Sequence, residues 1–140
     1  MWQHFLRLGK QYEKIKLILI PLICAAAALV LFRFIFLIGY VPSESMEPTL
    51  QKDSLILGLR TFDSLKKGDI IIFERNDKLL VKRIAGMPNE SIEISEHIYN
   101  IPESCYFVLG DNDKNSYDSR YWSCPYVNKN NIKAVLIFPQ

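Results

Sequence analysis

The segment VPSESMEPTL, residues 41–50, places Ser43 and Ser45 a few residues after a long apolar run, and a serine can act as a nucleophile. A serine hydroxyl is a weak nucleophile until a general base takes its proton. The two histidines, His4 and His97, are each expected to be ordinary surface residues, so the sequence does not predict a Ser-His-Asp triad. The base would then come from another side chain, and a neutral lysine is the natural substitute.

Lys82 fits the requirements of a neutral base because it lies in the apolar run LLVKRIAG. The pKa of free lysine lies near 10.4, and an apolar setting lowers it because the charged form loses its hydration. In a strand, Leu80, Lys82 and Ile84 would share one face and Val81 and Arg83 the other. The Arg83 guanidinium would then point away from the amine. Other lysines lie in polar turns or at strand edges: Lys66, Lys67, Lys78, Lys129 and Lys133.

Each of these features also has a simpler interpretation. Taken alone, Lys82 would more often be a surface lysine whose charged end reaches water, and Ser45 would cap a helix or turn before the sequence MEP. The polar segment GDNDKNSYDSRYW, residues 110–122, is too long for a hairpin turn. It begins with the 1, 3, 5 spacing of a calcium loop but lacks the glycine and glutamate that such a loop needs later. We predict no metal ion and no other cofactor.

An apolar run of 22 residues, 17–38, precedes these segments and contains a single charge, Arg33. As a helix it would extend for about 33 Å at about 1.5 Å per residue, which is enough to cross a bilayer. A buried core helix would show a polar face, and a cleavable signal would end in small residues; this run does neither. We therefore expect a single transmembrane anchor helix over residues 17–38.

The charges that flank the apolar run predict its orientation. Residues 1–16 carry four basic residues and one acidic residue, and the positive-inside rule places such a segment in the cytoplasm. Residues 39–140 would then form an extracytoplasmic domain at the cell membrane. From residue 41 onward, 12 Lys and Arg stand against 14 Asp and Glu, a net charge of −2. Nucleic acid is therefore not an expected partner.

Residues 39–140 contain short apolar runs separated by turn residues, which predicts one compact, mostly β domain. Cys105 and Cys124 lie in this exported part, where the compartment permits disulfides, and a bridge between them is one alternative. A zinc site is not expected, because no CxxC spacing occurs. The sequence does not indicate the oligomeric state.

Four motifs occur in an order and approximate spacing that resemble bacterial type I signal peptidases. They are SMEPTL, KKGDIIIF, LLVKRIAGMPNE and GDNDKNSYDSRYW, and the match extends from about Val41 to Phe138. The family is a group of membrane-anchored serine proteases with a β-rich catalytic domain and a Ser/Lys dyad. The resemblance implies that this chain removes N-terminal signal peptides from exported preproteins through an acyl-enzyme.

The resemblance also implies a role for each matching residue. Ser45 corresponds to the nucleophile and Lys82 to the general base. Ser43 matches the position whose hydroxyl joins the Ser45 N–H in an oxyanion hole. Ser116 matches the serine that hydrogen-bonds the lysine amine and orients it.

Further matches concern supporting residues and the substrate site. Asp118 and Arg120 match a structural ion pair near the site, which Arg83 is expected to join. The signal peptide would bind in an extended form between two strand edges, with small residues in shallow pockets. The lining residues implied by the match are Val41, Pro42, Met46, Leu50, Leu80 and Val81.

The chain departs from the family pattern at three positions, where Asn89, Asp113 and Ser123 replace the usual residues. None belongs to the expected dyad, and together they suggest a specialised set of substrates. A conjugation- or pilin-processing peptidase with the same dyad is therefore an alternative. A catalytically silent membrane-anchored binding module is another. Self-cleaving repressor peptidases share the dyad, but the apolar run and the lack of a DNA-binding region disfavour them.

Overall fold

The computed structural model describes residues 2–139 and, from residue 15 onward, their side chains. The chain forms two compact units, residues 1–34 and residues 35–140. Helix α1, Trp2–Ile35, forms the first unit except for its last residue, which belongs to the second. Its segment Ile15–Ile35 has a mean hydropathy of 2.7, so it is long and apolar enough to cross a membrane. The expected apolar helix is thus present, and it is followed by a β-rich unit.

The helix ends earlier than the apolar run does. We expected helical structure through Ile38, but Phe36–Tyr40 forms strand β1 instead. Leu37 is buried in the core of the second unit, and its backbone pairs with Gly58 of strand β2, Leu55–Leu59. Hydrophobicity alone did not separate these residues from the helix, because lipid and a protein core favour the same side chains.

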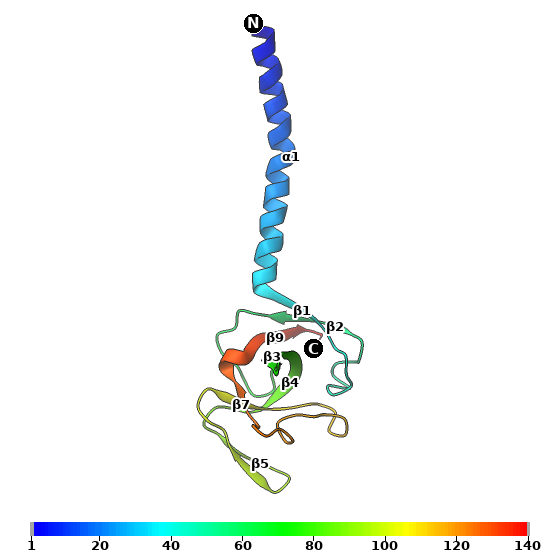
Figure 1. The fold of residues 1–140 in the computed structure, drawn as a ribbon, viewed down its shortest axis with the longest axis vertical. Helices are drawn as coiled ribbons and strands as arrows, with labels where there is room; N and C mark the ends of the chain where they lie inside the picture. Colours follow the sequence, from blue (N-terminus) through cyan, green and yellow to red (C-terminus); the bar gives the residue numbers. More distant parts are fainter. Residues whose placement is uncertain (1, 140) are drawn as a thin grey trace. The chain divides into compact units, whose positions relative to one another are not determined.

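The second unit is built on one seven-stranded antiparallel sheet with the order β1-β2-β9-β3-β4-β7-β8 (Figure 1). A separate hairpin, β5 and β6, forms the remaining sheet. The strands not yet bounded are β3 (Ile70–Arg75), β4 (Lys78–Gly86), β5 (Ser91–Ile94), β6 (His97–Asn100), β7 (Cys105–Leu109), β8 (Val127–Asn128) and β9 (Ile132–Phe138), and a 3-10 turn covers Lys129–Asn131.

Strand β3 lies at the centre of the core and has apolar side chains on both faces. Its residues alternate between two buried clusters, as the period of a strand requires. One cluster contains Leu37, Val41, Met46, Leu50, Ile56, Ile70, Ile72, Ala134 and Leu136. The other contains Leu65, Ile71, Phe73, Ile84, Tyr106, Val108, Trp122, Val127 and Ile132.

Strand β4 is paired unevenly on its two sides. Its pairing with β3 covers Lys78 to Arg83, whereas its pairing with β7 covers only Arg83 to Gly86. Within the described strands, the first half of β4 therefore has one edge without a partner. Such an edge presents N–H and C=O groups that another extended chain can bind.

Asn89 and the two cysteines of the β-rich unit bear on the sequence predictions. Asn89 has φ 64°, so it adopts the left-handed conformation expected of an asparagine in place of glycine. Cys105 and Cys124 are free thiols, so the disulfide considered above is not formed. Cys105 begins β7 opposite Asn128, and Cys124 lies exposed on a loop where its carbonyl accepts from Arg75.

Candidate active site

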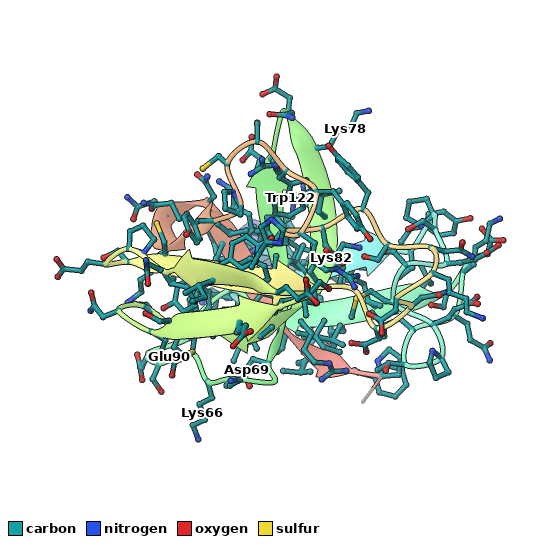
Figure 2. The ribbon with its side chains drawn as sticks, turned by 90° about the horizontal axis from the view of Figure 1, so that it is seen from below. Lys66, Asp69, Lys78, Lys82, Glu90 and Trp122 are labelled. Atoms are coloured by element: carbon teal, nitrogen blue, oxygen red, sulfur yellow. The ribbon has the colours of Figure 1, made fainter. Side chains whose placement is uncertain are left out.

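Lys82 lies in β4 with its side chain inside the domain. It is 4% exposed and stands opposite Ile71 of β3. Its strand neighbours alternate as predicted, since Ile84 is also buried and Arg83 is partly exposed. Figure 2 shows Lys82 within the body of the domain and Lys78, of the same strand, reaching outward. The strand period therefore turns this lysine into the domain, where its side chain is shielded from water.

Burial lowers the pKa of Lys82. The carboxylates of Asp118 and Asp111 raise this pKa and the Arg120 guanidinium lowers it, but the loss of hydration is the largest effect. A larger fraction of the amine is therefore uncharged at neutral pH than in an exposed lysine. An uncharged amine carries a lone pair that can accept a proton, as a general base must.

Ser45 lies directly beside this amine. Nζ of Lys82 donates to Oγ of Ser45 across 2.5 Å, although the two residues are 37 positions apart in the chain. Oγ of Ser43 lies 3.3 Å from Oγ of Ser45. Ser45 is 9% exposed, whereas Ser43 is exposed. The structure thus brings together three of the residues singled out from the sequence.

The loop after β7 holds the Ser45 segment in place. The backbone N–H of Asn112 donates to the carbonyl of Ser45 across 3.1 Å, and its side-chain amide donates to the carbonyl of Glu44 across 3.1 Å. Gly110 allows this close approach, because an added Cβ would lie 2.5 Å from the Ser45 carbonyl oxygen. The polar loop is therefore a support for the serine.

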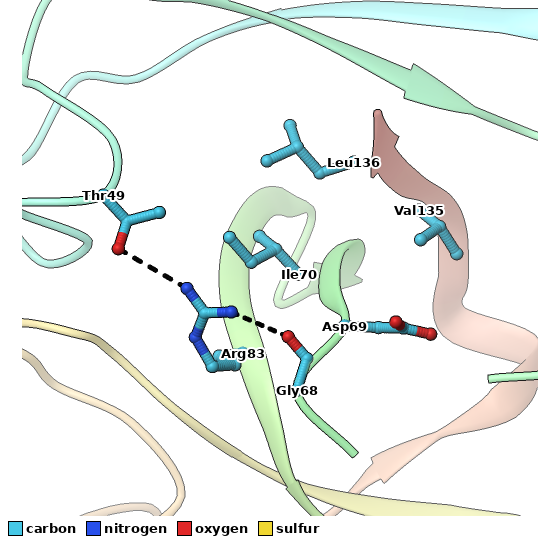
Figure 3. A pocket seen from close by; sticks show the side chains of 7 residues that line it. All are labelled: Thr49, Gly68, Asp69, Ile70, Arg83, Val135 and Leu136. Atoms are coloured by element: carbon cyan, nitrogen blue, oxygen red, sulfur yellow. Dashed lines mark hydrogen bonds between the residues drawn. The ribbon is translucent and has the colours of Figure 1, made fainter. Parts of the chain in front are cut away.

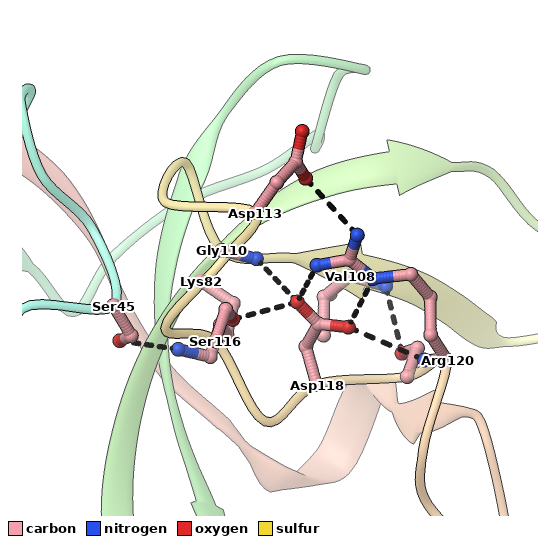
Figure 4. A network of polar contacts seen from close by, with 9 residues as sticks. Ser45, Lys82, Val108, Gly110, Asp113, Ser116, Asp118 and Arg120 are labelled. Atoms are coloured by element: carbon pink, nitrogen blue, oxygen red, sulfur yellow. Dashed lines mark hydrogen bonds and ion pairs between the residues drawn. The ribbon is translucent and has the colours of Figure 1, made fainter.

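Asp118 organises that loop from inside. It is fully buried and accepts hydrogen bonds from Nε and Nη2 of Arg120 at 2.9 and 2.8 Å, from the Gly110 N–H at 2.9 Å and from the Ser116 hydroxyl at 2.6 Å (Figure 4). Burial raises the pKa of Asp118, but these hydrogen bonds outweigh it and the net pKa is lowered. The carboxylate therefore stays charged with its oxygens satisfied. Arg120 also pairs with Asp113 at 3.0 Å.

Ser116 differs from what the resemblance implied. Its hydroxyl donates to Oδ2 of Asp118, not to the amine of Lys82. A buried carboxylate is the stronger acceptor, because hydrogen bonds to charged groups exceed those between neutral groups. Figure 4 shows Ser116 next to the bonded pair Ser45 and Lys82 but joined to Asp118. In this structure Ser116 therefore supports the loop through Asp118 and does not orient the Lys82 amine directly.

Arg83 also differs from the expectation, since it does not join the Asp118–Arg120 pair. It pairs with Asp111 at 2.6 and 2.8 Å and donates to the Gly68 carbonyl at 2.7 Å. The period of β4 explains this, because Arg83 and Lys82 face opposite sides of the strand. Arg83 lines a separate cavity of about 300 Å³ with Thr49, Gly68, Asp69, Ile70, Val135 and Leu136 (Figure 3).

A cleft of about 300 Å³ opens beside Ser45 and Lys82. Five of the six expected lining residues border it, namely Val41, Pro42, Met46, Leu80 and Val81. Leu50 does not, because it is completely buried in the first core cluster. The cleft is also lined by Ser43 and by four residues that the sequence reading missed: Tyr40, Leu79, Asn115 and Tyr117.

The position of Tyr40 and Leu79 could have been found from their neighbours. Each directly precedes a residue that was expected in the lining, Val41 and Leu80. Tyr117 gave no such signal, because an exposed tyrosine in a polar loop is ordinary. Its ring lines the cleft and lies parallel to that of Tyr121, with 6.1 Å between ring centroids.

The arrangement can support nucleophilic attack on a carbonyl bound in the cleft. A hydroxyl at hydrogen-bond distance from a partly uncharged amine can transfer its proton as it attacks. Within the described part of the chain, the backbone N–H of Ser45 meets no acceptor. It is therefore available, with the Ser43 hydroxyl nearby, to stabilise a developing oxyanion.

The sequence of the chain is similar to those of known proteins. The family model described as signal peptidase, peptidase S26, matches residues 13–99 and 95–139. Over 137 residues the chain is 33% identical to Signal peptidase I of Leptolyngbya laminosa, covering 71% of this chain and 66% of that protein. Over 118 residues it is 35% identical to Probable signal peptidase I-2 of Synechocystis sp., covering 59% and 54%. The chain thus spans between half and two thirds of the length of these two relatives.

A third relative bears on whether the site is active. The chain is 26% identical to a Staphylococcus aureus protein named Inactive signal peptidase IA, over 77% of this chain and 82% of that protein. The similar proteins therefore include one that is named as inactive. The chemistry has to be argued from the residues of the cleft.

Proposed function

Because the chain belongs to the signal peptidase family, peptidase S26, we propose that it is a membrane-bound serine endopeptidase that removes N-terminal signal peptides from exported preproteins. The observation that carries the proposal is the 2.5 Å contact between the Lys82 amine and the Ser45 hydroxyl in a buried setting. Burial supplies the lowered amine pKa that a lysine base requires.

In the proposed mechanism, uncharged Lys82 takes the proton of the Ser45 hydroxyl. The Ser45 oxygen attacks the scissile carbonyl, and the negative charge on the carbonyl oxygen is stabilised by the Ser45 N–H and the Ser43 hydroxyl. Protonated Lys82 then donates its proton to the leaving amine, which is the new N-terminus of the mature protein. An acyl-enzyme remains, with the signal peptide esterified to Ser45.

Hydrolysis of the acyl-enzyme uses the same base. Lys82, uncharged again, takes a proton from water as the water attacks the ester carbonyl. The signal peptide leaves with a free carboxylate, and the proton returns to the oxygen of Ser45. The proposed mechanism requires no cofactor.

The open edge of β4 supports an extended mode of substrate binding. Among the described strands, none pairs with the backbone of Leu79 to Lys82 on that side, and the cleft lies between this edge and residues 40–43. A signal-peptide end can therefore add as a strand and bring its scissile carbonyl to Ser45. The surrounding side chains would select small residues next to the cleavage point.

The membrane topology is part of the proposal. Residues 15–35 would cross the cytoplasmic membrane once, the basic segment 1–16 would stay in the cytoplasm, and residues 39–140 would face outward. In the chain, Ser45 follows the span after ten residues, so the nucleophile cannot travel far from the bilayer that holds an uncleaved signal peptide.

Cleavage of a preprotein tests the function directly. The full chain, solubilised in detergent, should cut a preprotein whose signal ends in Ala-x-Ala, and Ser45→Ala or Lys82→Ala should abolish cleavage. Ser64→Ala and Lys78→Ala, at exposed positions, are matched controls. Undiminished cleavage by either site variant would refute the assignment.

Two further measurements on the same solubilised protein distinguish the proposed function from its alternatives. A serine-directed acylating probe should label Ser45 in the wild type, and failure to label it would favour a silent binding module. A panel of general preproteins, pilins and conjugation proteins then distinguishes a general peptidase from a dedicated one, because only the latter would cut a single class.

A further inference from the structure

Asn112 contacts two consecutive backbone carbonyls of the segment that carries Ser45. Its side-chain Nδ2 donates to the carbonyl of Glu44, and its backbone N–H donates to the carbonyl of Ser45, each across 3.1 Å. The two contacts reach neighbouring peptide groups from one residue of a distant loop. Asn112 therefore fixes the orientation of the backbone on both sides of Ser45.

The side-chain contact bears on one particular peptide group. The carbonyl of Glu44 and the N–H of Ser45 belong to the same planar unit, and in a trans peptide they point in opposite directions. A hydrogen bond that holds the carbonyl therefore also sets the direction of the N–H. A bond accepted by the carbonyl also polarises the unit and makes the N–H a better donor.

We propose that Asn112 is a positioning residue that aims the Ser45 N–H at the oxyanion formed during peptide cleavage. The inference rests on the proposed function, in which this N–H stabilises the carbonyl oxygen under attack. Asn112 touches neither the substrate nor the reacting atoms in this role. Its contribution appears when charge develops on the substrate, since a donor fixed in advance needs no reorganisation at that moment.

Asn112 is itself held firmly enough to do this. Its carbonyl accepts from the N–H of Asn115 at 3.1 Å, which closes a turn. Two residues earlier, the N–H of Gly110 is bound to the buried carboxylate of Asp118. The hydrogen bonds around Asp118 thus hold the loop, and through Asn112 the loop holds the peptide group before Ser45.

The nature of the side chain is also specific. The Glu44 carbonyl can only accept a hydrogen bond, so its partner must donate, and the amide of asparagine does so without a charge. A lysine or arginine could donate as well, but its charge would raise the cost of protonating Lys82. An aspartate could not donate at all.

Steady-state kinetics with two variants test the proposal. Asn112→Ala removes the side chain, and Asn112→Leu keeps most of its bulk without the donor; both leave the backbone N–H in place. We expect kcat to fall about 10- to 100-fold in both, since losing one oxyanion donor outright costs about 10²- to 10³-fold. KM should stay within about twofold and the acid limb of the pH profile should not move, because Lys82 is unaffected.

An inhibitor gives a second readout. A peptide aldehyde that adds to Ser45 forms a tetrahedral oxyanion, so its affinity should fall by the same factor as kcat/KM. The same peptide ended by an unreactive alcohol should bind the wild type and both variants equally. Asn131→Ala, at an exposed position far along the chain, is the matched control and should leave all these values unchanged.

Several results would overturn the inference. One is a kcat within twofold of the wild type in both variants. Others are a loss of kcat/KM that comes from a raised KM, or a shift of the acid limb of the pH profile. Full activity of Asn112→Leu together with a low kcat of Asn112→Ala would also overturn it, because it would indicate that only the bulk of the side chain matters. Failure of both variants to fold while Asn131→Ala folds would show a purely structural role. Absence of cleavage by the wild type would instead refute the proposed function, on which the inference rests.

Discussion

Replacing Gly110 by alanine should disable the site by displacing the Ser45 segment. A Cβ at this position would lie 2.1 Å from Oγ of Ser116 and 2.5 Å from the carbonyl oxygen of Ser45. Ordinary contacts of a Cβ begin near 3.4 Å. Rotation of the Ser116 side chain would move its Oγ but not its Cβ, which would also lie 2.5 Å from the added atom, and the Ser45 carbonyl is backbone. Relief of the contact with this carbonyl therefore requires a shift of nearly 1 Å between the loop and the nucleophile.

The expected effect on activity is much larger than that on stability. A misplacement of about 1 Å at a reacting group can cost about 100-fold in rate. Overpacking of this kind typically destabilises a domain by about 1–3 kcal/mol. We therefore expect kcat for preprotein cleavage to fall by about 100-fold in Gly110→Ala, while urea unfolding still shows a folded protein.

Gly68→Ala provides the control for the loss of stability. Gly68 has φ 97°, and an added Cβ would meet nothing within 4 Å. Its cost is backbone strain of about 1–2 kcal/mol, without a displacement of the Ser45 segment. The reasoning would be contradicted if Gly110→Ala kept kcat within about threefold of the wild type. It would also be contradicted if kcat fell in Gly68→Ala by as much as is expected for Gly110→Ala.

Three further outcomes follow from the same contacts. Desolvation lowers the pKa of Lys82, so between this lowered pKa and about 10.4 the unfolded chain binds more protons than the native state. The free energy of unfolding therefore rises as pH increases through that window. Lys82→Met removes the cost of burying the charged amine, so it should raise the melting temperature at neutral pH, and this gain should shrink toward pH 10. The kcat/KM of the wild type should fall as pH drops through the lowered pKa of Lys82, in a pH titration of cleavage. Asp118→Ala leaves Arg120 without its buried partner and should cost about 3–5 kcal/mol in urea unfolding, whereas Asp113→Ala, with an 82% exposed side chain, should cost less than about 1 kcal/mol.

The sequence predicted the parts of the site that depend on local periodicity. The alternation along β4 placed Lys82 and Ile84 inside and Arg83 on the other face, as the structure has them. The mostly β domain and the apolar helix before it also followed from runs of apolar residues. These features need no knowledge of distant contacts.

Features that depend on distant contacts were predicted less well. Leu50 is apolar and close to Ser45 in the chain, but whether it faces the cleft or the core depends on how the segment folds back. Ser116 was expected to bond to the amine of Lys82, and its bond to Asp118 instead depends on the burial of that carboxylate. Asn112 was not singled out, because its partners lie more than sixty residues away.

The separation of Ser45 and Lys82 in the chain has a consequence for the life of the protein in the cell. The two residues meet only when β4 and the segment after β1 have both taken their places in the sheet domain. A newly made or partly unfolded copy has a hydrated, protonated lysine and a hydroxyl with no base beside it. Under the proposed mechanism, completion of the fold is therefore the step that places the base beside the hydroxyl.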